Sequence, residues 1–162
     1  MSSVIYPIAL DNDRDLAAEI GLLLSTYAII DLFILHIYSV VSGQDKDSSS
    51  IVLGRIKGNG QRIELIRELL RSSVRPAKDH ELNLLTDVEK ATRIRNQYAH
   101  AIYSQVSASS TGWRMSMWLS DGSWRKKEFK DISVKSVRED GTFVRSVLQS
   151  LFHFGSIAVA YE

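Results

Sequence analysis

The residues best suited to chemistry lie in one segment, 91-ATRIRNQYAHAIY-103, which places an arginine, two amides and a histidine between Arg95 and His100. The segment is typical of a helix, on which Asn96 and Gln97 share a face with His100, four and three residues later. Arg95 and His100 are separated by about 140° around the helix axis and roughly 7.5 Å along it. A second copy of the helix, related by a two-fold axis, would bring these two side chains together better than one helix can.

This pattern resembles the motif of the HEPN (higher eukaryotes and prokaryotes nucleotide-binding) domain family. In that motif an arginine and a histidine lie near the end of a long helix, with four to six residues between them. The residue after the arginine is commonly Asn, Asp or His. Arg95, Asn96 and His100 match this order, and Ala99 and Ala101 give the histidine the small neighbours that are frequent in the family. The resemblance implies a bundle of four or five helices and, in many members, a metal-independent endoribonuclease.

The same resemblance implies catalytic roles for three residues. His100 would be the general base or acid for the ribose 2′-hydroxyl, since histidine changes its protonation near neutral pH. Arg95 would hold the scissile phosphate, and Asn96 would orient the histidine or the phosphate. Two motifs would form one composite site across a homodimer. The implied product is a 2′,3′-cyclic phosphate, and neither a metal nor another cofactor is expected.

Several interpretations stay open at this point. Some family members are toxins paired with an antitoxin that modifies a tyrosine two residues after the histidine, but here that position is Ile102 and the tyrosine is Tyr103. A role in defence or stress would fit an active nuclease. Other members are non-catalytic interaction or assembly modules. The motif could also be a chance pattern in an unrelated helical scaffold, with His100 only a hydrogen-bonded interface residue.

Hydrophobic spacing predicts the elements that must position the motif. A first helix should begin after 11–15, where Asp11 or Asp13 can cap it, and end at Gly43. Further helices are expected at about 51–57 (capped by Ser48 to Ser50), 61–74, 79–103 and 133–158, with a weak point near 140–142. The sequence therefore predicts a mainly α protein, an HEPN-like up-and-down helical bundle in which residues 1–162 form one domain.

One β-hairpin at 113–129 is expected as an insertion in this bundle. Apolar residues alternate from Trp113 to Leu119, and Asp121-Gly122 favours a tight turn before the next run. The hairpin also gathers aromatic and basic side chains: Trp113, Trp118, Trp124, Arg125, Lys126 and Lys127. They could bind RNA by stacking and charge, with Arg93 extending the phosphate-binding surface. Alternatively the tryptophans pack onto the bundle and the basic residues protect an edge strand.

Composition and hydropathy restrict the class of protein and of chemistry further. The chain has 162 residues, 44% of them hydrophobic, no cysteine and a formal net charge of +1, so disulfides and thiolate chemistry are excluded. The stretch from Leu22 to Val41 has about the length of a membrane span, but Asp31 lies in its middle, and we interpret it as a buried helix that gives Asp31 a polar partner. We see no signal peptide. These observations predict a cytoplasmic protein that does not bind membranes, and the homodimer is what the family resemblance implies.

Overall fold

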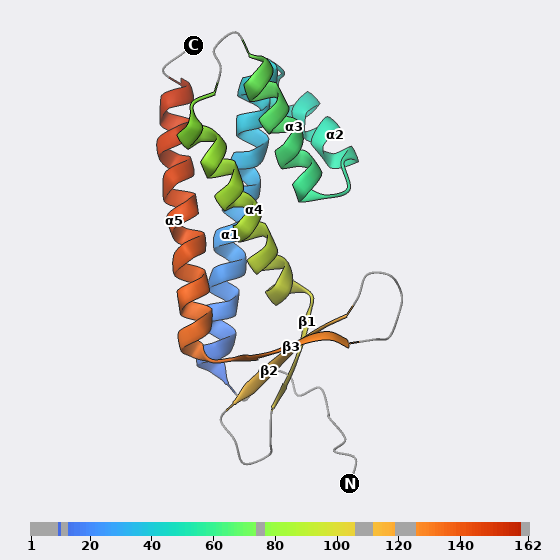
Figure 1. Ribbon diagram of the computed structural model, residues 1–162, viewed down its shortest axis with the longest axis vertical. Helices are drawn as coiled ribbons and strands as arrows, with labels where there is room; N and C mark the ends of the chain where they lie inside the picture. The colour runs from blue at the N-terminus through green and yellow to red at the C-terminus, as the bar shows by residue number, and fades with distance from the viewer. Residues whose placement is uncertain (1–9, 11–12, 74–76, 106–111, 119–125, 160–162) are drawn as a thin grey trace. The chain divides into compact units, whose positions relative to one another are not determined.

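The computed structural model describes residues 10, 13–73, 77–105, 112–118 and 126–159, without the side chains of 104–105, 116–118, 126–129 and 155–159. These residues form five helices and one small three-stranded sheet (Figure 1). The helices are α1 (Arg14–Ser42), α2 (Lys46–Arg55), α3 (Asn59–Ser72), α4 (Asp79–Ala99) and α5 (Val134–Val159). The strands are β1 (Ala101–Gln105), β2 (Trp113–Trp118) and β3 (Lys126–Ile132). The predicted mainly helical fold class is confirmed.

Contacts divide the chain into two compact units, which we describe separately. The sheet unit comprises 1–25 and 94–142, and the helical unit comprises 26–93 and 143–162. Because α1, α4 and α5 each continue past a boundary, each of these helices contributes residues to both units.

In the sheet unit, α1 begins where the sequence predicts. Asp13 Oδ1 accepts a hydrogen bond from the backbone N–H of Leu16 at 3.0 Å, which satisfies one of the free donors at the helix N-terminus. The other carboxylate oxygen, Asp13 Oδ2, accepts from the indole Nε1 of Trp113 at 2.9 Å. Trp113 and Met115 are both 2% exposed, as expected for alternate residues on the buried face of a strand.

The sheet has the order β1-β2-β3 with both pairings antiparallel. The prediction of a two-stranded hairpin at 113–129 is therefore incomplete, because β1 forms a further strand and β3 extends to Ile132. Between β2 and β3, Arg114 lies opposite Asp131 and donates to it from Nε at 2.7 Å. This exposed pair lowers the pKa of Asp131 through the hydrogen bond from the guanidinium. The predicted turn at Asp121-Gly122 lies outside the described residues.

The prediction that the fourth helix continues to Tyr103 is wrong. The helix ends at Ala99, and Ala101 to Gln105 pair with Met117 to Trp113. Backbone groups that would have continued the helix find partners in the ladder instead, and β-branched and aromatic residues such as Ile102 and Tyr103 suit a strand. Tertiary pairing therefore overrides the local helical pattern.

In the helical unit, the connection from α1 to α2 confirms the predicted end of the first helix and corrects the predicted start of the second. Gly43 has a φ of 68°, the left-handed conformation that commonly terminates a helix. The next helix begins at Lys46 rather than at about 51, and its cap is Asp45 rather than one of the serines. Asp45 accepts from the backbone N–H of Ser48 at 2.9 Å, and this hydrogen bond lowers the pKa of Asp45.

A polar network joins three helices inside the helical unit. Tyr27 of α1 and Thr92 of α4 share a buried hydrogen bond of 2.7 Å, and Thr92 donates onward to the carbonyl oxygen of Val88 at 2.8 Å. Asn59 at the start of α3 donates from Nδ2 to Tyr27 Oη at 3.0 Å and to Asp31 Oδ1 at 3.1 Å. The expectation that Asp31 finds a polar partner is confirmed.

The predicted weak point at 140–142 does not interrupt α5, which is continuous from Val134 to Val159. Gly141 lies inside the helix, where a Cβ would be 4.0 Å from the Cβ of Leu23 in the same unit. A Cβ at this position would make only an ordinary van der Waals contact, so packing does not require the glycine, and the helix continues through it. The helix α1 is long and apolar enough to cross a membrane by length and composition, but core helices of soluble proteins pass the same test.

Candidate functional site

The three predicted catalytic residues lie at the C-terminal end of α4, in the sheet unit. Arg95 is partly buried and donates from Nη1 to Asn96 Oδ1 at 2.9 Å, so the two neighbouring side chains contact each other directly. Within the described residues, the Asn96 Nδ2 group has no hydrogen-bond partner in the chain. The guanidinium and the amide nitrogen thus form a group of donors at the helix end, suited to an anionic ligand.

His100 is exposed and stands in the turn between α4 and β1. Its backbone N–H donates to the carbonyl oxygen of Asn96 at 3.2 Å, so the chain keeps a helical spacing up to the histidine although the helix ends at Ala99. No described residue forms a hydrogen bond or ion pair with the imidazole ring. The ring is open to solvent in the single chain, and the alternative that His100 is a hydrogen-bonded interface residue stays a prediction.

A tyrosine hydroxyl holds the turn that carries His100. Tyr103 Oη donates to the carbonyl oxygen of Tyr98 at 2.6 Å, which satisfies one of the last four carbonyl groups of α4. The contact spans the turn, from the third residue of β1 back to the last turn of α4. It therefore fixes the backbone on both sides of the histidine.

The side chain of Tyr98 anchors the same helix end to α5. It is 2% exposed, and its Oη donates to Asp140 Oδ2 at 2.7 Å. Lys130 Nζ lies 3.4 Å from the same carboxylate oxygen. Burial and the hydrogen bond to Asp140 raise the pKa of Tyr98 well above its ordinary value, and burial raises the pKa of Tyr103 to about 12. Both phenols are therefore neutral donors at physiological pH.

These three supporting residues were not identified from the sequence. From the sequence, Tyr103 was considered only for modification by an antitoxin, and Asp140 only as part of a weak point in a helix. The available signal was weak, because Asp140 is far from the motif in sequence and only the folded chain brings it to Tyr98. The hydrogen bond of the Tyr103 hydroxyl also bears on whether an antitoxin could modify this tyrosine, since the hydroxyl donates to the backbone of the same chain.

Of the predicted RNA-binding residues, only Arg93 has a described side chain, so their arrangement stays a prediction. Arg93 is exposed on α4 but belongs to the helical unit. Arg125 lies outside the described residues, and Lys126 and Lys127 belong to β3, where only the backbone is described. Trp113, proposed as part of a stacking surface, is instead buried against the sheet unit, which confirms the packing alternative for that residue.

Across the described residues, no group of three or more His, Asp or Glu side chains is arranged to hold a metal ion. No protein-family model, curated protein or solved structure matches this chain. The site must therefore be interpreted from its own residues.

Proposed function

We propose that this protein is an HEPN-like, metal-independent endoribonuclease or RNA-binding protein whose composite site is formed by two copies of the chain. The observation that carries the proposal is the exposed His100 one helical turn beyond the bonded pair Arg95 and Asn96. The exposed imidazole supplies a proton-transfer group, and the Arg95 guanidinium and the Asn96 amide supply hydrogen-bond donors for a phosphate at the same helix end.

The chemistry itself favours two copies. In the proposed reaction the ribose 2′-oxygen loses its proton and attacks phosphorus, and the bond from phosphorus to the 5′-oxygen breaks. The products are a 2′,3′-cyclic phosphate and a 5′-hydroxyl, so one group must accept a proton and another must donate one. A single chain offers one imidazole in this region, whereas a two-fold assembly would offer two.

Arg95 and Asn96 would act on charge rather than on protons. Negative charge increases on the phosphate oxygens in the transition state, and a guanidinium can stabilise it through paired hydrogen bonds. The contact from Arg95 to Asn96 restricts the rotamers of both side chains before RNA binds. We propose a cytoplasmic homodimer serving defence or stress, with toxin activity under an antitoxin as one such role.

Cleavage of a fluorescent RNA in EDTA tests the catalytic proposal. His100→Ala and Arg95→Ala should each reduce the rate by about 10²-fold or more, the usual contribution of a general acid or base and of a positioned charge. The matched controls are His153→Ala and Arg71→Ala, which remove an exposed histidine and an exposed arginine of the helical unit. Equal cleavage by His100→Ala and His153→Ala would refute the proposal.

Dilution tests the two-copy site independently. Specific activity should fall in step with the dimer fraction measured by sedimentation, because a monomer would lack half of the site. Activity that is constant while the dimer dissociates would show that one chain suffices.

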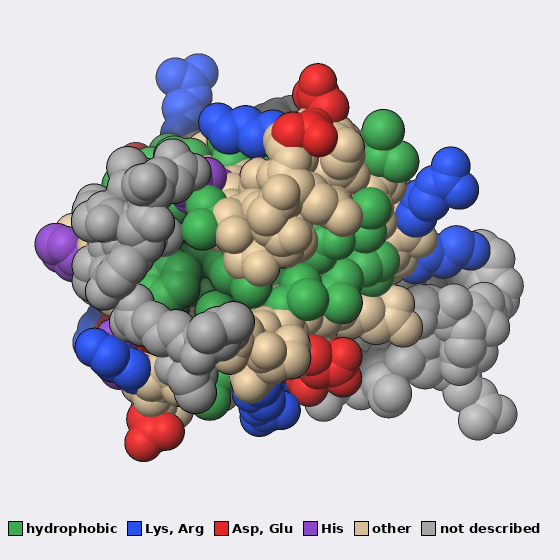
Figure 2. Space-filling model, turned by 90° about the horizontal axis from the view of Figure 1, so that it is seen from above, with side chains coloured by type: hydrophobic (Ala, Val, Ile, Leu, Met, Phe, Trp, Pro, Cys, Tyr) green, Lys and Arg blue, Asp and Glu red, His purple; other side chains and the backbone are tan. Residues whose placement is uncertain are grey.

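The second candidate is a non-catalytic interaction module, and exposed apolar side chains favour it. In the helical unit, Ile29, Leu32, Val40, Ile51 and Phe152 are between 36% and 66% exposed. Figure 2 shows hydrophobic side chains open to solvent and flanked by charged groups at one end of the molecule. Such surfaces commonly mark protein contacts. For this candidate, the wild-type protein would cleave no RNA and the motif variants would alter partner binding.

A further inference from the structure

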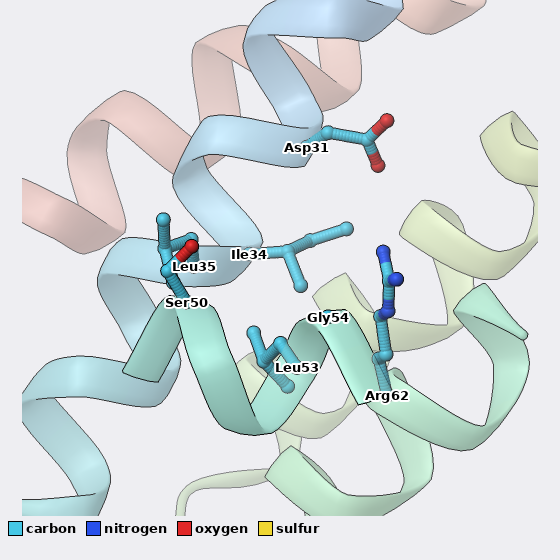
Figure 3. A pocket seen from close by; sticks show the side chains of 7 residues that line it. All are labelled: Asp31, Ile34, Leu35, Ser50, Leu53, Gly54 and Arg62. Atoms are coloured by element: carbon cyan, nitrogen blue, oxygen red, sulfur yellow. The ribbon is translucent and has the colours of Figure 1, made fainter. Parts of the chain in front are cut away.

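One side of α1 is left uncovered by the described residues of the helical unit. Other sides of the helix contact its neighbours. Tyr27 shares its buried hydrogen bond with Thr92 of α4, and Ile34 lines a pocket together with Leu53 of α2 (Figure 3). His36 lies nine residues after Tyr27, which places it on the opposite side of the helix at about 100° per residue. The uncovered side is therefore the side of His36, whose side chain is partly exposed.

Apolar side chains form a stripe along this uncovered side. Ile29, Leu32 and Val40 are 42%, 66% and 36% exposed. With His36 they lie within about 80° of one another around the helix axis and span roughly 17 Å along it. Their spacings of three and four residues are those of helices that pack against a partner helix. We call these four residues the α1 stripe.

The ring of Phe152 extends this apolar surface onto α5. It is 52% exposed, and its centroid lies 4.6 Å from the centroid of the Phe33 ring of α1, with 72° between the two ring planes. Edge-to-face packing of this kind holds the exposed ring in place. Two helices of the unit therefore present exposed apolar side chains, which is typical of a surface that binds another protein.

The α1 stripe contains no Asp, Glu, Lys or Arg. Between 26 and 42 the single residue of these types is Asp31, which accepts a hydrogen bond from Asn59 of α3 and does not belong to the stripe. Helices that select a different helix as their partner commonly do so through charges that flank the apolar stripe. A two-fold contact instead sets a surface against its own copy, where like charges would repel and uncharged side chains do not. The charge pattern of α1 thus favours a second copy of this chain.

A lipid surface suits this helix less well. By length and composition α1 could cross a membrane, but the hydrogen bond from Tyr27 to Thr92 holds it among the other helices. Helices that lie on membranes carry basic side chains beside their apolar face. In contrast, α1 has no basic residue in its last turn and is followed by the exposed Asp45 and Asp47.

We propose that the α1 stripe packs against the α1 stripe of a second copy of this chain, about a two-fold axis close to Leu32. Among the three apolar residues of the stripe, Leu32 is the most exposed and lies between Ile29 and Val40, so it gains most from burial. The inference rests on the two-copy assembly of the proposed function and names the surface that joins the copies.

Sedimentation of the full-length protein tests the surface. Leu32→Glu places a carboxylate without a partner in the contact and should raise the dimer dissociation constant at least about tenfold. Ile51→Glu is the matched control, because Ile51 is 62% exposed but lies on α2, outside the stripe. Its dissociation constant should stay within about twofold of the wild-type value. Equal effects of the two substitutions, or a wild type that stays monomeric at high micromolar concentration, would overturn the proposal.

Cross-linking locates the contact. The chain has no cysteine, so Leu32→Cys and Ile51→Cys each carry a single thiol per copy. A short bis-maleimide should join two copies of Leu32→Cys and leave Ile51→Cys unlinked, because a residue close to a two-fold axis lies beside its own copy. A monomeric wild type that binds phosphatidylglycerol vesicles, and loses them in Leu32→Glu, would assign the stripe to a membrane and overturn the proposal.

These outcomes separate the contact from the chemistry. A wild-type dimer that cleaves no RNA would refute the nuclease and leave the contact standing. A dimer that Leu32→Glu does not weaken would refute the contact and leave the nuclease standing.

Discussion

Asp13 is the residue at which the stability of the sheet unit can be tested most sharply. One carboxylate oxygen caps α1 through the N–H of Leu16, and the other accepts the indole N–H of Trp113, whose side chain is 2% exposed. Replacing Asp13 with alanine removes both contacts. A lost N-cap costs about 1 kcal/mol, and a lost hydrogen bond to a charged group costs roughly 1.5–3 kcal/mol.

Asp13→Ala should therefore lower the free energy of unfolding by about 3 kcal/mol, or the melting temperature by roughly 6–12 °C for a chain of this size. Asp13→Ser separates the two contacts, because serine caps a helix well but is too short to keep the bond to the indole. Its cost should be about 2 kcal/mol, all of it from the Trp113 contact.

Urea denaturation of Asp13→Ser, Trp113→Phe and the double variant completes a double-mutant cycle. We expect a coupling energy of about 1–2 kcal/mol, since the phenylalanine removes the donor that the carboxylate serves. If Asp13→Ser is as stable as the wild type, or if the coupling is below about 0.5 kcal/mol, the bridge from Asp13 to Trp113 does not stabilise the unit.

Two further predictions concern Tyr103 and the glycines. Burial raises the pKa of Tyr103 from 10.0 to about 12. The stability that the neutral phenol contributes is therefore complete below pH 10 and is lost as pH rises through about 12. An ultraviolet titration of the wild type should show a late phenolate step that is absent in Tyr103→Phe, and ionisation of Tyr103 at the ordinary pKa would contradict the burial. Gly43→Ala should lower the free energy of unfolding by about 1 kcal/mol because the φ of Gly43 is 68°. Gly54→Ala inside α2 should raise the free energy of unfolding by about 0.5 kcal/mol. Thermal melts that show equal effects of the two substitutions would contradict both assignments.

Local signals were sufficient for most helix positions. The cap at Asp13 and the terminator at Gly43 follow from side-chain and backbone chemistry that acts within a few residues. The wrong prediction of the α2 cap has a local cause as well. Asp45 lies three residues before Ser48, and its carboxylate accepts hydrogen bonds from the Ser48 backbone N–H and hydroxyl, so Asp45 caps the helix rather than one of the three later serines. Such choices between neighbouring caps depend on where the preceding helix stops.

Long-range pairing explains what local patterns could not predict. Nothing between 99 and 105 forbids a helix, and the strand at Ala101 to Gln105 exists because Met117 to Trp113 pair with it. The support of the candidate site has the same origin, since Asp140 reaches Tyr98 across 42 positions of sequence. The motif residues are a hypothesis that the sequence alone supplies, whereas the contacts that support them appear only in the folded chain.

The end of α4 at Ala99 changes how the candidate site must work. A histidine within a continuing helix would be held by the hydrogen bonds of the turns before and after it. His100 has only the turn before it, through Asn96, and the following residues belong to a strand. Its position therefore depends on the bond from Tyr103 to the carbonyl of Tyr98. If two imidazoles must converge across a two-fold axis, a small displacement of this turn would separate them in both copies at once. In the proposed reaction, proton transfer would be more sensitive to that displacement than phosphate binding by Arg95 would be, so loss of the Tyr103 hydroxyl should reduce RNA cleavage more than RNA affinity.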